Sequence, residues 1–171
     1  MSTQPHIALS PEFDAAHFRS ALSQFATGVT IITTRLADGS LHGLTASSFN
    51  SVSLNPPLVL WSLSNSASSM ASFSANSHYV INVLAADQEQ LAMHFSRRTE
   101  NRFENIDYTL SRSGMPILNG VVAWFECHNR SRYQEGDHVI FVGEVERCDL
   151  TPAPALTYHG GRFGATSAPG A

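Results

Sequence analysis

Two long runs of strand-forming residues, separated by a four-residue turn, constrain the fold of this chain more than any other feature. The runs cover residues 121–133 and 138–150, and the connecting Gln134-Glu135-Gly136-Asp137 contains a glycine suited to the positive φ of a tight turn. Strands joined by so short a connection run antiparallel, because a parallel pair needs a longer crossover. The sequence therefore predicts a long antiparallel hairpin.

Other Val-, Ile- and Thr-rich runs alternate with turn signals along the rest of the chain. Asp38-Gly39 is a strong hairpin signal, and Asn55-Pro56-Pro57 must interrupt a strand because proline lacks the backbone donor. No GxGxxG or GxxxxGK[ST] motif follows a strand, which argues against a Rossmann or P-loop fold. We predict an antiparallel, mainly β barrel with strands at 28–35, 41–53, 58–63 and 78–84, and short helices at 66–75 and 87–95, the second capped by Asp87.

A further helix is predicted near the N-terminus. Ser10 is a candidate N-cap, Pro11 follows at the first helical position, and acidic residues occupy the first turn. Apolar residues then recur at helical spacing, so we expect this helix to pack on a core and to end at Gly28 in a left-handed conformation. The residues that carry this spacing are Phe18, Leu22 and Phe25.

The 171 residues indicate one domain. We expect a flexible N-terminus at 1–10, the folded domain at 11–164 and a disordered Ala-, Ser-, Pro- and Gly-containing tail at 165–171. The polar segment 97–119 is predicted to form an ordered excursion over the surface.

Composition narrows the classes of partner. The net charge of -4, without clusters of Lys and Arg, argues against nucleic acid and membrane surfaces, and no apolar run is long enough to span a membrane. Charged residues make up only 14% of the chain, against about 25% in an average soluble domain, so a ligand or another subunit is expected to cover part of the surface. Cys127 and Cys148 lack metal-ligand spacing, which favours reduced thiols, a cytoplasmic location and no metal site.

Two polar segments are candidates for binding chemistry. Residues 43–57 are rich in small hydroxyl residues, which let a planar ring approach the backbone and donate hydrogen bonds to its edge. Residues 64–69 combine hydroxyls with free N–H groups before a predicted helix, an arrangement that suits a phosphate. Taken singly, the first also fits a polar edge strand and the second an ordinary helix-capping cluster.

Together with other segments, these two resemble the flavin reductase-like family with the FMN-binding split-barrel fold, which includes the reductase components of two-component flavin monooxygenases. The resemblance extends from residue 18 to residue 163, and its pieces are weak singly but specific in this order and spacing. They are Phe25-Ala26-Thr27-Gly28-Val29-Thr30, residues 45–57, Tyr79-Val80-Ile81-Asn82-Val83-Leu84, Phe95 with Arg102-Phe103, Gly136-Asp137-His138, Gly143-Glu144-Val145 and Leu156-Thr157-Tyr158-His159-Gly160-Gly161.

The resemblance implies a Greek-key split barrel and an oxidoreductase of the NAD(P)H-dependent flavin reductase type (EC 1.5.1.-). The hydride would pass from NADH or NADPH directly to FMN or FAD, with no catalytic acid or base and no metal. It also implies a homodimer with the flavin site between subunits, and a reduced flavin that leaves for a separate oxygenase. The identity of that oxygenase, and whether the flavin is substrate or tightly bound, stay open.

The resemblance also assigns residues. It places the flavin against two stretches and two later positions: Thr45, Ala46, Ser47, Ser48, Phe49, Ser62, Leu63, Asn65, Ser66, Ser68, Ser69, Phe95 and Arg102. Family members often carry a basic residue where this chain has Asn65. Either another residue supplies the positive charge for the phosphate, or the loop relies on neutral hydrogen-bond donors. The choice between FMN and FAD therefore stays open.

The nicotinamide is assigned to His138, Tyr158, His159 and Gly160, with NADH and NADPH both possible. His138 is expected to contact the nicotinamide rather than the flavin, because it lies far along the chain from both flavin-binding stretches. His6, His17 and His42 are expected to be solvated surface residues.

Two other functions stay open: a flavin-binding module without turnover, and an FMN-dependent reductase of another acceptor such as a corrinoid. The segments 136–138 and 158–160 favour a nicotinamide-using enzyme, because a passive flavin carrier has no need of them.

Overall fold

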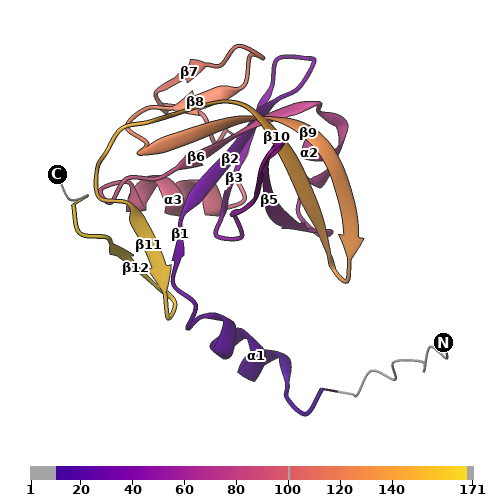
Figure 1. Cartoon of the computed structure of the whole chain (residues 1–171), viewed down its shortest axis with the longest axis vertical. Helices are drawn as coiled ribbons and strands as arrows, with labels where there is room; N and C mark the ends of the chain where they lie inside the picture. Colours follow the sequence, from indigo (N-terminus) through magenta and orange to yellow (C-terminus); the bar gives the residue numbers. More distant parts are fainter. Residues whose placement is uncertain (1–10, 100, 169–171) are drawn as a thin grey trace.

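The computed structural model describes residues 11–99 and 101–168, and Figure 1 shows a curved β-sheet from which the N-terminal helix projects. The predicted flexible residues 1–10 and the last three residues of the tail lie outside the described part. The main sheet has seven antiparallel strands in the order β3-β2-β6-β9-β10-β5-β4. These are β2 (Thr30–Arg35), β3 (Leu41–Ala46), β4 (Asn50–Leu54), β5 (Pro57–Ser64), β6 (His78–Val83), β9 (Ala123–Glu135) and β10 (His138–Leu150).

The predicted long hairpin is confirmed as β9 and β10. The strands close on a two-residue turn in which Gly136 has φ 57°, a conformation that favours glycine. Register shifts after Val142 and Val145 mark bulges, which bend a strand and increase its twist. The hairpin therefore curves across the whole domain (Figure 1).

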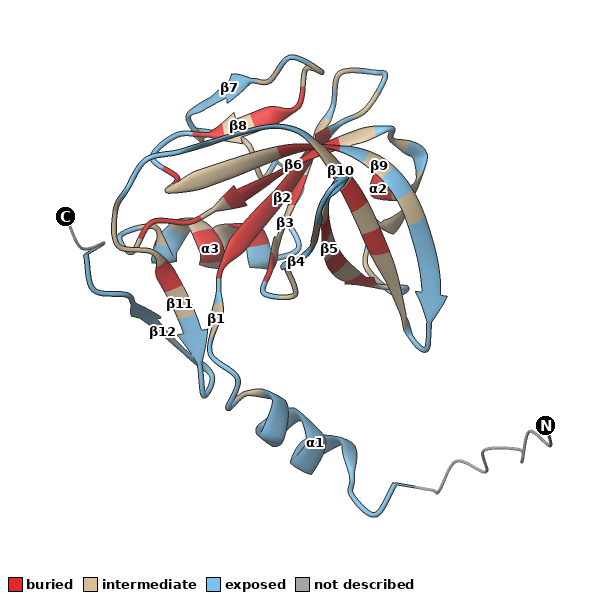
Figure 2. Cartoon of the chain, in the orientation of Figure 1, coloured by how far each residue is buried: buried red, intermediate tan, exposed pale blue. Residues whose placement is uncertain are grey.

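Both faces of the sheet are covered. Inside the curve, Trp61 stacks on Phe141 with ring centroids 4.6 Å apart and packs edge-on against Phe73 and Tyr79. On the other side a second cluster, which includes Ile31, packs beneath α3 (Glu89–Ser96). The mainly β, antiparallel expectation is confirmed, and Figure 2 shows the buried residues concentrated on these strands.

A small three-stranded sheet, ordered β1-β11-β12, brings the end of the chain back to the barrel. Its strands are β1 (Thr27–Gly28), β11 (Leu156–His159) and β12 (Arg162–Ala165). Thr166 is hydrogen-bonded to Ala155 in both directions, at 3.0 and 2.9 Å, so backbone order continues past residue 164.

The N-terminal helix differs from the prediction. The helix α1 (Ala15–Leu22) begins after Asp14, whose carboxylate accepts a hydrogen bond from the His17 N–H, and Ser10 lies outside the described residues. It ends well before Gly28, which belongs to β1 and pairs with Thr157. The expectation that it packs on the core is wrong for a single chain: none of its residues is buried (Figure 2).

The other two helices are shorter than or shifted from the prediction. The helix α2 (Met70–Ala75) has only six residues. The cap of α3 is Gln88 rather than Asp87, because the Gln88 N–H and side-chain oxygen both bond to Ala85 in a tight turn. No helix in the described part of the chain is long and apolar enough to cross a membrane.

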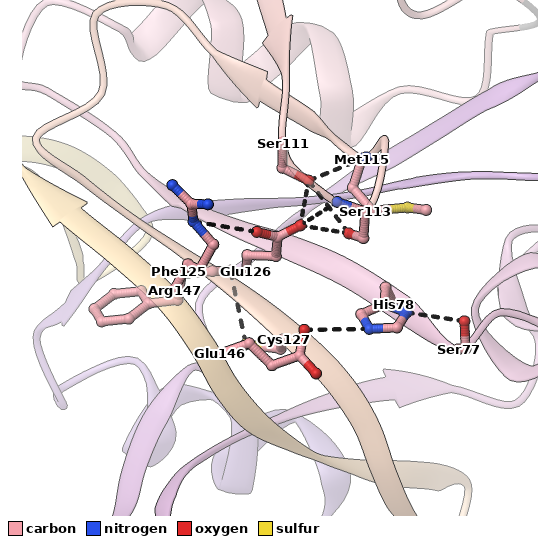
Figure 3. Close-up of polar contacts among 10 residues, drawn as sticks. All are labelled: Ser77, His78, Ser111, Ser113, Met115, Phe125, Glu126, Cys127, Glu146 and Arg147. Atoms are coloured by element: carbon pink, nitrogen blue, oxygen red, sulfur yellow. Dashed lines mark hydrogen bonds and ion pairs between the residues drawn. The ribbon is translucent and has the colours of Figure 1, made fainter.

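In the predicted excursion at 97–119, residues 101–119 contain the short hairpin of β7 (Tyr108–Leu110) and β8 (Pro116–Leu118). Glu126 of β9 holds it on the sheet (Figure 3). One carboxylate oxygen accepts hydrogen bonds from the Ser111 hydroxyl at 2.6 Å, the Ser113 N–H at 2.7 Å and the Ser113 hydroxyl. The other oxygen lies 3.9 Å from Arg147, and the side chain is 1% exposed.

The ionised form of Glu126 is favoured despite this burial. Burial raises the pKa of the carboxyl, but the donors of Ser111 and Ser113 and the charge of Arg147 outweigh it and hold the pKa below its ordinary value of 4.5. A carboxylate whose pKa is lowered by folding stabilises the protein above the unfolded pKa, and this contribution is lost as the pH falls through the folded pKa.

We therefore predict that Glu126→Gln lowers the free energy of unfolding by about 1 to 3 kcal/mol at neutral pH, because strong charge-assisted hydrogen bonds are lost. The difference from wild type should shrink as the pH falls from 4.5, the ordinary pKa of the carboxyl, through its lower pKa in the folded protein. Urea unfolding of both proteins at several pH values measures this difference in the free energy of unfolding. The control is Glu144→Gln, which removes an exposed pair with Arg130 and should cost less than about 1 kcal/mol. A Glu126→Gln effect independent of pH would contradict the assignment.

Candidate functional site

Four cavities join end to end along one side of the barrel. Neighbouring cavities share lining residues, so the four lie in a row, which we call the groove. The central cavity is lined by Val29, Thr45, Ser47, Met93, Ser96, Tyr158, Gly161 and Phe163. The helix cavity continues from it past α1 and is lined by Arg19, Leu22, Ser23, Phe25, Thr27, Ser47, Tyr158 and Gly161.

The groove continues in the opposite direction through two polar cavities. The serine cavity shares Thr45 and Ser96 with the central cavity and is lined by Leu44, Thr45, Leu63, Ser64, Ser66, Ala67, Ser68, Ser69, Phe95, Ser96, Arg98 and Arg102. The histidine cavity shares Ser68, Ser69 and Arg102 with it and adds Ser40, Leu41, His42, Gly43 and Thr99. No Asp or Glu lines any of the four cavities over the described ranges.

The first polar segment contributes to the groove through alternate residues. Thr45 lies on β3 and donates to the Ala92 carbonyl of α3 at 2.6 Å, while Ser47 lines two cavities. Ala46 and Phe49 pack against the core instead. The Ser48 hydroxyl accepts from the Ser62 N–H at 2.9 Å and is thus engaged within the protein.

The second polar segment forms the loop between β5 and α2. Ser68 and Ser69 line both polar cavities, and Ser66 lines one. Ser66 is hydrogen-bonded to the Ser64 hydroxyl at 2.9 Å. Asn65 does not line the groove: its N–H donates to the Asp137 carbonyl and ties the loop to the β9–β10 turn. Since α2 has six residues and Ser69 makes no side-chain cap, a helix dipole contributes little here.

The positive charge that Asn65 cannot supply comes from Arg98 and Arg102, which line the serine cavity. Arg102 donates from Nη1 to the Gly43 carbonyl at 2.6 Å, and its Nε is buried with no partner in the described structure. Burial lowers the pKa of Arg102, although a guanidinium keeps its charge at neutral pH. Sequence reasoning identified Arg102 but missed Arg98, whose only signal was a basic pair directly after the predicted helix.

Phe95 forms part of the wall of the serine cavity. Its side chain is buried, and its ring lies edge-on to Phe103 at 5.2 Å. A Cβ at position 43 would lie 2.7 Å from the Phe95 ring, so only glycine lets α3 approach β3 this closely.

The residues assigned to the nicotinamide fall in two places. Tyr158 lines the central and helix cavities at the β11 end, and the Gly160 N–H donates to the Ser23 carbonyl at 2.8 Å. His159 is exposed on the same turn. His138 instead begins β10, pairs with Ser64 of β5, and contacts the Asp137 carboxylate at 2.7 Å. Sequence distance was therefore misleading: His138 lies directly beside the serine segment.

The single chain does not bring His138 and Tyr158 together. Figure 1 shows the tip of the β9–β10 hairpin and the β11–β12 turn on different sides of the molecule. In the described residues, no group of three or more His, Cys, Asp or Glu side chains is arranged to hold a metal ion.

Comparison with known proteins identifies relatives over nearly the whole chain. The FMN reductase (NADH) SmoA of Agrobacterium fabrum is 40% identical over 159 residues, which are 93% of this chain and 90% of that protein. The reductase subunit HsaB of a flavin-dependent monooxygenase from Mycobacterium tuberculosis is 35% identical, with 89% and 83% covered.

Solved structures give the same result. The NADH:FAD oxidoreductase SgcE6 of Streptomyces globisporus C-1027, solved in complex with NAD and FAD fragments, is 36% identical and superposes with a TM-score of 0.86 over 94% of this chain and 98% of that one. The fold is the split barrel that the resemblance implied. Residues 22–167 match the family described as "Flavin reductase like domain", and the chain belongs to that family.

Proposed function

We propose that this protein is a flavin reductase, which oxidises NADH or NADPH with FMN or FAD as acceptor. The row of adjacent cavities, the groove, is the observation that carries the proposal. It has a mixed apolar and polar central cavity, and polar cavities with two arginines on one side of it. These two parts suit a planar ring and a phosphate.

The residues present fit a flavin on chemical grounds. Val29, Met93 and Phe163 offer apolar surface for a ring, while Thr45 and Ser47 offer polar atoms at its edge. The guanidinium of Arg102 and the hydroxyls of Ser68 and Ser69 offer donors to a phosphate.

Electrostatics support an anionic ligand. The groove is lined by Arg19, Arg98 and Arg102 and by no carboxylate in the described residues, in a protein of net charge -4. A cleft that carries the opposite sign to the whole protein concentrates ligands of matching charge. Flavin phosphates and nicotinamide dinucleotides are both anions.

A bound flavin supplies an acceptor for the hydride of a reduced nicotinamide, a two-electron chemistry that side chains do not provide. The residues of the groove bind and orient. Tyr158 and Ser47 border both the central and helix cavities, so a second ring entering past α1 would meet the first between them. Holding the two rings at contact distance is the main contribution expected of the protein.

The extension of the groove past Tyr158 favours an enzyme over a passive flavin-binding module, because a carrier needs no space for a second ligand. Relatives named as monooxygenase reductase subunits support an oxygenase partner that receives the reduced flavin. Reduction of another acceptor, such as a corrinoid, is the alternative. Two free cysteines, Cys127 and Cys148, agree with a cytoplasmic location.

We also propose a homodimer in which α1 packs on the partner subunit. The eight-residue helix has no buried residue, and an isolated helix of this length is not stable in water. Its neighbourhood exposes Phe13, Phe18, Leu22 and Phe25, the last 76% exposed. A second subunit would cover this surface and would supply His138 to the groove that holds Tyr158 of the first.

Flavin dependence tests the activity. We predict that flavin-stripped protein oxidises NADH slowly in air and that added FAD or FMN raises the rate at least tenfold, because the hydride needs an acceptor in the groove. Absorbance of NADH measures this, with Glu144→Gln as a control distant from the groove. A rate that added flavin does not change would exclude the proposed reaction.

The dimer is tested on Phe25, which follows α1 in the chain. We predict that Phe25→Ser shifts the protein toward monomer in sedimentation experiments at micromolar concentration, because it removes apolar contact area from the interface while disturbing no buried residue of the chain. Leu110→Ser, on an apolar side chain of β7 that is also exposed, at 51%, should leave the dimer intact. A wild-type monomer with full activity would contradict the proposal.

Shared sites are tested by subunit complementation. His138→Ala and Tyr158→Ala should each lower kcat/KM for NADH about ten- to a hundredfold, about 1.4 to 2.7 kcal/mol of transition-state stabilisation. A mixed dimer of the two variants should regain about half the wild-type activity, because one of its two sites then contains both side chains. Without recovery, the two residues do not meet across the dimer.

A further inference from the structure

A further cavity lies apart from the groove, where the turn of the β7–β8 hairpin meets the β9–β10 ladder. Its volume is about 420 Å³, within the roughly 300–1,000 Å³ of small-molecule sites, and it shares no lining residue with the groove. We call it the charged cavity, because its lining consists of two guanidiniums, two carboxylates and one hydroxyl. The residues are Arg112, Ser113, Glu126, Glu146 and Arg147.

A bulge in β10 directs two consecutive side chains into the charged cavity. Successive residues of a regular strand point to opposite faces of the sheet, so neighbours do not normally line the same surface. The register shifts between Val145 and Arg147, which leaves Glu146 as an extra residue without a pairing partner of its own. Bulges re-aim side chains in this way and are frequent beside functional sites. Here the bulge lets Glu146 and Arg147 line one cavity.

The Glu126 carboxylate has one oxygen that the protein satisfies and one that it does not. Oε1 accepts the hydrogen bonds that hold the excursion on the sheet. Oε2 is buried, accepts no hydrogen bond from the described residues, and lies 3.9 Å from Nε of Arg147, beyond hydrogen-bond distance. Figure 3 shows this oxygen turned away from the two serines and toward Arg147. A buried carboxylate oxygen without a donor is costly, so a donor from a molecule in the cavity would satisfy it.

The two guanidiniums keep donors available for a ligand. Arg112 is exposed and forms no ion pair among the described residues, and Arg147 has only the long contact with Glu126. A guanidinium presents its donors in a planar fork that matches a carboxylate. The Glu146 carboxylate is oriented by His78, whose Nε2 lies 3.3 Å from its Oε2 (Figure 3). The cavity therefore offers donors for a carboxylate and acceptors for an ammonium.

The charges of the cavity favour a ligand that carries both signs. A simple anion would meet two carboxylates and a simple cation would meet two guanidiniums, and like charges brought together oppose binding. An α-amino acid carries its ammonium and its carboxylate on the same carbon, so one small molecule can satisfy both kinds of group.

We propose that the charged cavity binds a free α-amino acid, whose ammonium donates to Oε2 of Glu126 and whose carboxylate accepts from Arg112 and Arg147. The site goes beyond the proposed flavin chemistry, which uses none of these residues. A bound amino acid would connect the turn of the β7–β8 hairpin to β9 and β10, and would therefore strengthen the attachment of the excursion to the sheet.

Three probes that differ in the charges they carry test the inference on the full-length protein. They are L-alanine, propionate, which lacks the ammonium, and L-alaninamide, which lacks the carboxylate. In calorimetric titrations L-alanine should bind about tenfold or more tightly than either analogue, because each analogue leaves charged groups of the cavity without a partner. Saturating L-alanine should also raise the melting temperature, since a ligand that binds only the folded state stabilises it.

Variants at the edge of the cavity test the assigned residues without disturbing the core. Arg112→Gln should weaken L-alanine binding about tenfold and leave the melting temperature of the ligand-free protein unchanged. Arg162→Gln, on an exposed arginine of β12 outside the cavity, is the matched control and should bind L-alanine like wild type. Glu146→Gln should narrow the ratio of L-alanine to propionate affinity, because it removes a carboxylate that opposes a simple anion.

The inference is overturned if L-alanine does not bind, if either analogue binds as tightly, or if Arg112→Gln binds L-alanine like wild type. None of these measurements involves a flavin or a nicotinamide. The flavin reductase proposal therefore stands or fails separately.

Discussion

The antiparallel ladder between β9 and β10 is the interaction on which the rest of the structure depends. The hairpin places β5 along one edge and β6 along the other, so every strand of the main sheet is attached to it directly or through one of these two. Phe141 of β10 stacks on Trp61, its directly opposite partner on β5, and this cross-strand contact stabilises the pairing of the two strands. Stacked aromatic pairs of this kind add to the area that they bury.

The groove is a consequence of how the remaining elements close around that sheet. The helix α3 lies on β3 because Gly43 has no side chain to oppose Phe95. The returning strand β11 is tied to the barrel by its pairing with β1 and by the Leu156 N–H bond to the Leu84 carbonyl. The central cavity therefore lies between elements that are distant in sequence.

Sequence patterns predicted the local elements well and the spatial groupings less well. The hairpin and the break after Leu54 were predictable, since turn chemistry and alternation are local signals, although Pro57 already belongs to β5. The predicted strand at 41–53 is divided into β3 and β4 in the structure. The exposure of α1 was not predictable, because an apolar stripe does not show whether its own chain covers it. Arg98 and His42 were missed for a related reason: only the fold brings them to one groove with Ser68 and Ser69.

The place of Tyr158 and Phe163 in the groove has a consequence for truncated chains. A chain that ends after β10 keeps every strand of the main sheet but lacks the wall supplied by β11 and β12, and it also lacks Leu156, which is buried in the second core cluster. Loss of the last strands would therefore open the groove and weaken the core together, so the binding surface and the stability of the scaffold depend on the same short segment.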